Sequence, residues 1–276
     1  MTTQMPPPGP APRPPAPPAP QLAPSVRFAY SFGRIEPRCP QMSIDREIAQ
    51  AIGTLADEVP EGERMRRVLV DPSNQYLVRK LCWVFSVRGQ DAFVVTPADP
   101  MDWKLLPETL GRDASGWVDV VIGHLAPPAG ACAALGLPLV HFDRLHSFSR
   151  AQLLEQLHEL RGARKLPAEH FDQAFDQLIT LAEDNLGTAD ADRALNYLVL
   201  RYPDIYQLVA EQLTAGRALE SVRARPSPLG VPRRILDLVL SFLDGRDGGY
   251  SRHYVRVDIT EEFPFLVSGA GPYVEH

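Results

Sequence analysis

The sequence contains few cysteines, and the absence of paired cysteines excludes two classes of site. Its three cysteines, Cys39, Cys82 and Cys132, are widely spaced and form no CxxC pair, so the usual zinc-ribbon and thioredoxin-like motifs are missing. Cys82 lies inside an apolar segment, where a thiol behaves as a small buried hydrophobic group. We therefore predict that each cysteine is a reduced structural thiol.

Long apolar segments are also absent. The longest, Ile235 to Leu243, is too short to span a bilayer and contains Asp237. The chain does not start with the basic residues and apolar core of a secretion signal. These absences predict a cytoplasmic protein with no membrane partner.

A surplus of basic residues and the familiar catalytic motifs are missing too. Lysine and arginine number 28 against 34 acidic residues, which gives a net charge of −6 and argues against nucleic acid as a partner. The sequence has no GxSxG elbow, no HExxH pair and no phosphate-binding GxxxxGK loop. We accordingly predict no catalytic residues and no cofactor.

Proline, in contrast, is abundant and concentrated at the start of the chain. Residues 1–24 hold 11 of the 28 prolines and almost no large apolar side chain. Such a segment cannot bury enough surface to offset its chain entropy. We predict a disordered tail rich in polyproline-II conformation.

Beyond the tail, hydrophobic periodicity predicts a mixed α/β fold of the α+β class. Period-two alternation and short apolar runs mark strands, whereas apolar stripes at helical spacing mark helices. The predicted strands occupy about residues 26–31, 81–87, 92–96, 117–122, 137–142, 235–242 and 255–259, and the predicted helices 43–57, 101–110, 153–160, 171–179, 189–201 and 204–215. Pro37 and Pro40 predict a loop after the first strand. An α/β portion (25–147) should thus precede a portion made of helices and an antiparallel hairpin (148–276).

Four segments carry a family resemblance: Gly33-Arg-Ile-Glu-Pro-Arg38, Leu81-Cys-Trp-Val-Phe85, Val118-Asp-Val-Val-Ile-Gly123 and Tyr254-Val-Arg-Val-Asp-Ile-Thr-Glu-Glu-Phe-Pro-Phe-Leu-Val267. They resemble the domain at the C-termini of the cyanobactin maturation proteins PatA and PatG, over about residues 28–273. In that family the domain follows a protease, divides into two portions and has an unsettled role. The resemblance implies a part in ribosomal peptide biosynthesis. It does not imply macrocyclisation, because this chain carries a proline-rich segment where those proteins carry the protease.

Arg34, Glu36 and Arg38 alternate around Pro37 after the first predicted strand. They could form a polar lip that binds a peptide carboxylate, since arginine offers a bidentate fork. The alternative is an intrachain ion pair that fixes the loop.

A second charged group lies near the C-terminus. Arg256 and Asp258 share one face of a predicted strand, Asp237 could lie beside them, and Glu261 and Glu262 follow. Paired carboxylates could perform acid–base chemistry if burial raised one pKa. A solvated sheet face is the simpler interpretation.

His124, His141, Asp143 and His146 lie at the ends of two predicted strands. Their side chains could bind zinc, but their spacing matches no standard zinc motif. We therefore predict no metal site.

Taken with the missing motifs, the resemblance predicts a non-catalytic accessory domain that binds a precursor peptide or a peptide-modifying enzyme of the same pathway. Two alternatives are an enzyme of unrecognised chemistry acting on a peptide and a self-associating, homo-oligomeric scaffold. If the first strand paired with the terminal sheet, Arg34 and Glu261 would share one surface. Replacing either by alanine would then weaken binding of the same peptide.

Overall fold

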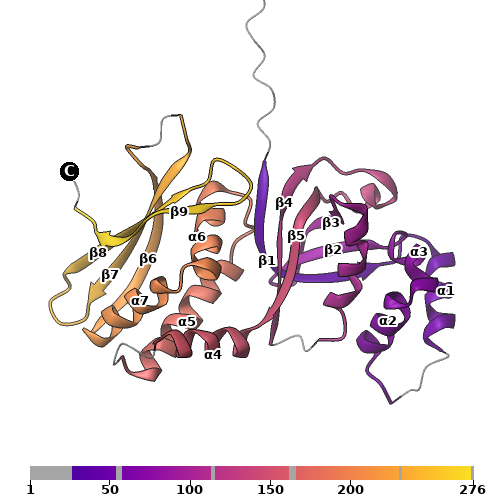
Figure 1. Ribbon diagram of the computed structural model, residues 1–276, viewed down its shortest axis with the longest axis horizontal. Helices are drawn as coiled ribbons and strands as arrows, with labels where there is room; N and C mark the ends of the chain where they lie inside the picture. Colours follow the sequence, from indigo (N-terminus) through magenta and orange to yellow (C-terminus); the bar gives the residue numbers. More distant parts are fainter. Residues whose placement is uncertain (1–26, 54–57, 113–115, 162–165, 230–231, 275–276) are drawn as a thin grey trace, which may run out of the picture.

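The computed structural model describes residues 27–53, 58–112, 116–161, 166–229 and 232–274. The predicted tail, residues 1–24, lies outside the described residues. Within them the chain forms three layers, namely a small barrel, a layer of helices and an open sheet (Figure 1). The mixed α+β class predicted from the sequence is confirmed, including the antiparallel C-terminal strands.

Five strands close the barrel in the order β1-β2-β3-β5-β4. All neighbouring pairs are antiparallel except β3 and β5. Their bounds are β1 (Phe28–Arg38), β2 (Cys82–Val87), β3 (Gln90–Pro97), β4 (Trp117–Ala126) and β5 (Leu139–Ser149). The interior is filled mainly by aromatic and branched side chains, including Trp83, Phe85, Phe93, Val121 and Phe142. The predicted hairpin of β2 and β3 is confirmed.

β1 is longer than predicted and changes partner along its length. Its first half, up to Gly33, pairs with β4, and its second half, from Arg34, pairs with β2. At the change, the buried carboxylate of Asp119 accepts a hydrogen bond from the Ile35 amide at 3.0 Å. The predicted loop at Pro37 is wrong, because the strand continues to Arg38. Proline is tolerated there since this half of β1 pairs with β2 alone.

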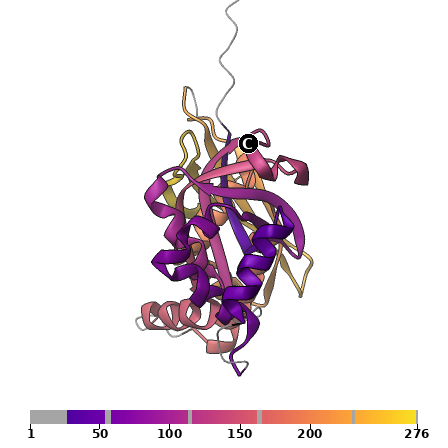
Figure 2. The same ribbon diagram turned by 90° about the vertical axis from the view of Figure 1, so that its right-hand side faces the viewer.

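Short helices cover the outer end of the barrel, where Figure 2 shows α1 and α2 in dark purple in front of the strands. They are α1 (Met42–Ile52), α2 (Glu61–Val70) and α3 (Gln75–Val78), with the 3-10 helices η1 (Pro72–Asn74), η2 (Pro100–Leu105), η3 (Pro107–Thr109) and η4 (Gly130–Leu135). The helix predicted at 101–110 is in fact η2 and η3. Helix α2 was not predicted.

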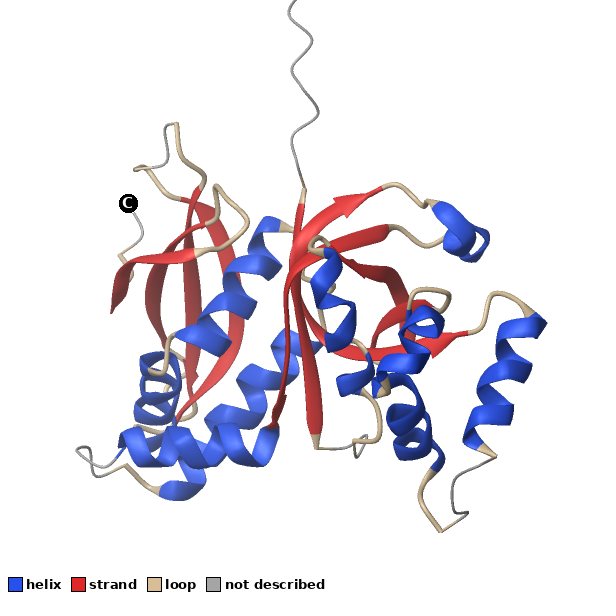
Figure 3. Ribbon diagram, turned by 45° about the vertical axis from the view of Figure 1, so that its right-hand side comes forward, coloured by secondary structure: helices blue, strands red, loops and turns tan. Residues whose placement is uncertain are grey.

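The second half of the chain consists of four helices followed by a four-stranded antiparallel sheet in the order β6-β7-β8-β9. The helices are α4 (Arg150–Arg161), α5 (Ala168–Glu183), α6 (Asp190–Arg201) and α7 (Asp204–Thr214), and the strands β6 (Arg217–Pro226), β7 (Ile235–Asp244), β8 (Tyr250–Asp258) and β9 (Phe265–Pro272). Figure 3 shows helices between the two sets of strands. One apolar core joins the barrel wall, this helical layer and the inner face of the sheet. The two halves are therefore packed as one body.

The loop between α5 and α6 fastens the helical layer to the open edge of β1. The Gly187 carbonyl accepts a hydrogen bond from the Tyr30 amide at 2.8 Å, and the buried Asn196 donates one to the Tyr30 carbonyl at 2.7 Å. Gly187 has a φ of 65°, and a Cβ there would lie 2.1 Å from the Tyr30 carbonyl oxygen. Only glycine fits this contact.

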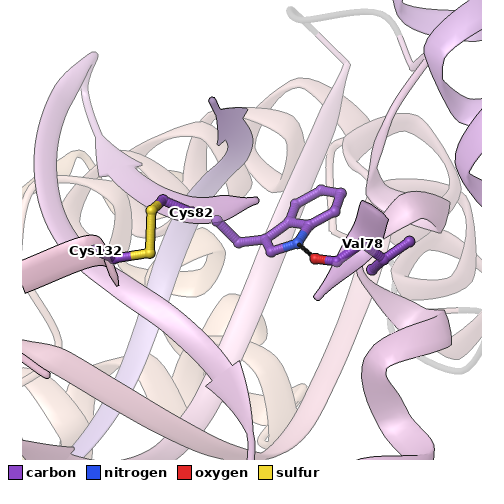
Figure 4. Close-up of a disulfide and its surroundings, with 4 residues drawn as sticks. Val78, Cys82 and Cys132 are labelled. Atoms are coloured by element: carbon purple, nitrogen blue, oxygen red, sulfur yellow. Dashed lines mark hydrogen bonds between the residues drawn. A yellow bond between two sulfur atoms is a disulfide. The ribbon is translucent and has the colours of Figure 1, made fainter. Parts of the chain in front are cut away.

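A disulfide between Cys82 and Cys132 joins the start of β2 to η4 (Figure 4). Beside it, the indole of Trp83 donates a hydrogen bond to the Val78 carbonyl at 2.9 Å. The prediction of reduced thiols is wrong for these two residues, whereas Cys39 is free and exposed. The pairing has no signal in the sequence because 50 residues separate the partners.

This bond predicts a simple labelling result. Under denaturing, non-reducing conditions iodoacetamide should alkylate Cys39 alone, whereas prior reduction should expose all three thiols. Intact mass measurement counts the labels. Three labels without reduction would show that the bond is not formed in the purified protein.

Candidate functional site

A cleft of about 510 Å³ opens where the barrel, α6 and the loop between β8 and β9 meet. Pockets of this size hold small ligands or the end of a peptide. Its walls are formed by Tyr30, Ile122, Arg144, Leu145, His146, Tyr197, Arg201, Phe263 and Pro264. The cleft thus combines aromatic rings with basic side chains.

A β-bulge in β5 turns Arg144 toward this cleft. The register with β4 shifts between Ile122 and Gly123, and both Phe142 and Leu145 pack on the barrel interior. The two residues between them, Asp143 and Arg144, are both exposed on the outside. Bulges re-aim side chains in this way next to functional sites.

Among the described residues, the lining of the cleft includes two permanent positive charges and no carboxylate. Arg144 and Arg201 supply the charges, and both are exposed. Burial lowers the pKa of His146, and the positive charges of Arg201 and Arg144 lower it further. The imidazole is therefore neutral near pH 7, where it can donate one hydrogen bond and accept another.

Tyr30 presents a buried hydroxyl to the same cleft. Burial raises the pKa of Tyr30 to about 12, against the opposing influence of Arg201. The hydroxyl oxygen is buried, and Arg201 lies close enough to lower the Tyr30 pKa both by its charge and by a hydrogen bond. Arginine can only donate, so the phenol hydrogen still needs an acceptor, and a ligand oxygen bound beside Arg201 would supply one.

Tyr197 fixes the opposite wall of the cleft. Its hydroxyl oxygen accepts a hydrogen bond from the Leu266 amide at 3.0 Å, which ties α6 to the start of β9. The hydroxyl hydrogen remains available as a donor. Two arginines and two phenols therefore converge on one space, a set that suits an anionic oxygen such as a carboxylate.

Arg193 holds the loop that closes the cleft. Its side chain is 1% exposed and donates to the carbonyls of Ile259 at 3.2 Å, Glu262 at 3.1 Å and Glu261. The guanidinium also lies 5.1 Å from the centre of the Phe28 ring at the start of β1. Burial lowers the pKa of Arg193 to about 10, so the group stays charged at neutral pH.

Beside the cleft, Glu262 of this loop meets Asp143 of the bulge. Burial raises the pKa of the Glu262 carboxyl to about 7, the hydrogen bond and negative charge of Asp143 raise it too, and Arg193 opposes both. The His124 imidazole lies 3.9 Å from the Asp143 carboxylate. The Glu262 carboxyl can therefore hold a proton near neutral pH.

The raised pKa makes stability depend on pH in a defined direction. Folded Glu262 binds a proton that an ordinary unfolded glutamate releases, so its contribution is complete below about pH 4.5 and is lost as the pH rises through about 7. We expect Glu262→Gln to change little at about pH 5 and to stabilise the protein relative to wild type at about pH 8.

Thermal melts of both proteins across this range test that expectation. Groups that do not interact with Glu262 contribute equally in both proteins, so their effect cancels in the difference. A melting-temperature difference independent of pH would show that Glu262 ionises like an exposed glutamate.

Two family models match the chain. The PatG Domain model covers residues 28–200, and the PatG C-terminal model covers residues 164–273. The chain belongs to the PatG domain family. The resemblance found in the sequence is confirmed.

A solved structure described as "PatG Domain of Unknown Function" has the same fold as this PatG domain. It is 19% identical in sequence and superimposes with a TM-score of 0.67, over 90% of this chain and 98% of the other. No curated protein matched the sequence. No helix within the described residues is long and apolar enough to cross a membrane.

The predicted lip of the PatG domain lies on the barrel, away from the cleft. Arg38 forms ion pairs with Glu36 at 3.4 Å and with Asp91 of β3 at 3.5 Å, and all three side chains are about half exposed. Arg34 lies 3.4 Å from the Trp117 carbonyl and lines a separate hollow of about 160 Å³. Intrachain pairing therefore accounts for Glu36 and Arg38.

The C-terminal charged residues are more deeply placed than a solvated sheet face would be. Arg256 bonds Asp237 through two hydrogen bonds of 2.6 and 2.9 Å, so the predicted proximity of these residues is correct. Asp258 is 1% exposed, pairs with Arg233 at 2.7 Å and accepts a hydrogen bond from the Thr260 amide. Glu261 is exposed.

The predicted shared surface of Arg34 and Glu261 is wrong. β1 pairs with β2 and β4, and the terminal strands form a separate sheet. The Arg193 contact brings Phe28 near the 259–262 loop. Arg34 lies six residues beyond Phe28 on the same extended strand, which separates these two residues by roughly 20 Å.

The histidines form no metal site within the described residues. His124 and His141 face each other with ring centres 5.1 Å apart, and His141 bonds Thr96. His146 lies five residues further along β5, opposite Val120, and lines the cleft instead. Tyr30, Arg144, Tyr197 and Arg201 were not predicted as site residues, because positions so far apart in the sequence form no motif.

Proposed function

We propose that this PatG domain is a peptide-binding accessory domain of a ribosomal peptide pathway and that its cleft holds a peptide carboxylate. The observation that carries the proposal is the convergence of Arg144, Arg201 and the buried Tyr30 hydroxyl in one cleft. Arginine binds carboxylate through paired, charge-assisted hydrogen bonds. Tyr197 and Phe263 add aromatic contact area at small entropic cost.

Family membership supports the pathway, and the chemistry of the cleft supports the ligand. A cleft of about 510 Å³ is too small for a folded partner but accepts the last residues of a chain. A C-terminal carboxylate, or an acidic side chain near the end of a precursor peptide, satisfies the cationic wall.

Calorimetric titration with N-acetylated tetrapeptides, each as free acid and as C-terminal amide, tests the proposal. The acids should bind at least roughly tenfold more tightly than the amides, because a charge-assisted hydrogen bond contributes about 1.5–3 kcal/mol. Arg201→Gln should remove most of this difference. The matched control is Arg46→Gln on α1, an exposed position at the far end of the barrel, which should bind like wild type.

Two results would count against a carboxylate site. One is equal affinity for acids and amides, and the other is unchanged binding in the Arg201 variant.

A second candidate function rests on Glu262. The pKa of its carboxyl is raised to about 7 beside Asp143, and His124 lies next to Asp143. Such a carboxyl could act as a general acid or base on a bound peptide. Incubation of the protein with precursor peptides, followed by mass spectrometry, distinguishes the two. A mass change that Glu262→Gln abolishes would establish an enzyme, and an unchanged mass supports a binding domain.

A further inference from the structure

The outer face of the C-terminal sheet carries a cluster of arginines and tyrosines. The helices pack on the other face, against Leu238, Leu240, Val255 and Val257, so alternate residues point away from them. The pairing register places these outward residues in three rows across the sheet: Ser221, Ser241 and Arg252, then Arg223, Val239 and Tyr254, then Arg225, Asp237 and Arg256. We call these rows, with Tyr250 and Tyr273, the arginine face.

Positive charge dominates the arginine face. It holds four arginines. Among the described residues the carboxylates beside them are Asp237, which bonds Arg256, Asp258, which pairs with Arg233, and Glu220, which bonds the Tyr250 hydroxyl. Three of the arginines, Arg223, Arg225 and Arg252, surround a hollow of about 440 Å³. The whole chain carries a net charge of −6. A local basic surface on an acidic protein steers acidic partners to that surface.

Aromatic rings hold three of these guanidinium groups in place. Arg225 lies 5.6 Å from the Tyr273 ring centre and donates to its hydroxyl at 2.9 Å. Arg252 lies 5.8 Å from the ring centre of Tyr250, and Arg256 lies 5.2 Å from that of Tyr254. Side chains positioned in advance lose less freedom on binding, which favours recognition by their donor forks.

We propose that the arginine face binds an extended acidic segment of a partner protein. Arg223 and Arg225 lie two residues apart on β6, a separation of about 7 Å that equals the spacing of alternate side chains in an extended peptide. Carboxylates at every second position would therefore meet both arginines. Single-stranded nucleic acid fits less well, because the guanidinium groups already lie over the tyrosine rings on which bases would stack.

This surface is separate from the cleft, and its test uses different residues and a different probe. The probe is a fluorescein-labelled, C-terminally amidated peptide of alternating glutamate and valine. The comparison peptide is identical except that glutamine replaces each glutamate. The amide removes the terminal carboxylate that the cleft would take. Anisotropy titrations should show binding of the glutamate peptide that weakens with salt.

The double variant Arg223→Glu, Arg225→Glu should weaken that binding at least roughly tenfold. Arg46→Glu, which makes one charge reversal of the same kind at a remote exposed site, should change it less than about twofold. If the double variant melts at a lower temperature, Arg223→Gln replaces it, with a loss of severalfold expected.

Equal binding of the glutamate and glutamine peptides would overturn the proposal. So would unchanged binding in the variants, or tighter binding of a single-stranded RNA to the same face. If the Arg201 variant bound tetrapeptide acids as tightly as wild type, the proposed carboxylate site in the cleft would be overturned. The proposal for the arginine face would be unaffected.

Discussion

Replacing Arg193 by methionine is expected to destabilise the protein by about 3–5 kcal/mol. The side chain is 1% exposed and is the donor to three carbonyls of residues 259–262. Methionine fills a similar volume but removes the donor to the Glu261 and Glu262 carbonyls and leaves Ile259 with Arg234 alone, and each lost donor costs about 1–3 kcal/mol. For a chain of this size, the melting temperature should fall by roughly 10 °C, as measured by circular dichroism.

Arg234 provides the matched control. It contacts the same segment, donating to the Ile259 carbonyl at 3.4 Å and the Thr260 carbonyl at 3.2 Å, yet its side chain is 45% exposed. Arg234→Met should cost less than about 1 kcal/mol, because water replaces the lost donor. Equal losses in the two variants would contradict the conclusion that burial makes Arg193 the anchor of this loop.

Val257→Asp is expected to prevent folding or to cost more than about 4 kcal/mol. Val257 is fully buried in the core shared by the sheet, the helices and the barrel. An aspartate there has no cation to pair with in this apolar surrounding, and burying such a charge is costly. Soluble yield and chemical unfolding measure the effect.

Two comparisons make this result specific to burial. Val267→Asp makes the same substitution in the same sheet at a residue that is 39% exposed, and it should be tolerated. Arg256→Ala breaks the pair with Asp237 and should be milder than Val257→Asp. If Val257→Asp and Val267→Asp were equally tolerated, the register of the terminal strands would be wrong.

Local sequence patterns were sufficient to predict the helices and strands that bury one regular face. The β2–β3 hairpin, helices α5 to α7 and the inward positions Val255, Val257 and Ile259 were predicted, because their periodicity reports burial directly. Strands β6 and β9 were missed. Both lie at the edges of their sheet and contain only half-buried and exposed residues, so they resemble loops in sequence.

Long-range pairing explains the remaining errors. β1 carries the same alternation whether it joins the barrel or the terminal sheet, so the hypothesis that it pairs with the terminal sheet could not be tested from the sequence and was wrong. The Cys82–Cys132 bond and the cleft were not predicted for the same reason. Each is built from segments that lie far apart in the sequence and meet only in the tertiary fold. Arg193 was missed because an arginine in an amphipathic helix is usually exposed.

The central claim, that the cleft of this PatG domain binds a peptide carboxylate, is tested most directly by NMR of the arginine side chains. Arginine Nε–Hε signals, assigned by single substitutions, are followed while an N-acetylated tetrapeptide acid is added, and again with the matching amide. The signals of Arg144 and Arg201, which line the cleft, should shift saturably with the acid and remain unchanged with the amide. Shifts of equal size with the amide, or shifts confined to arginines outside the cleft, would contradict it.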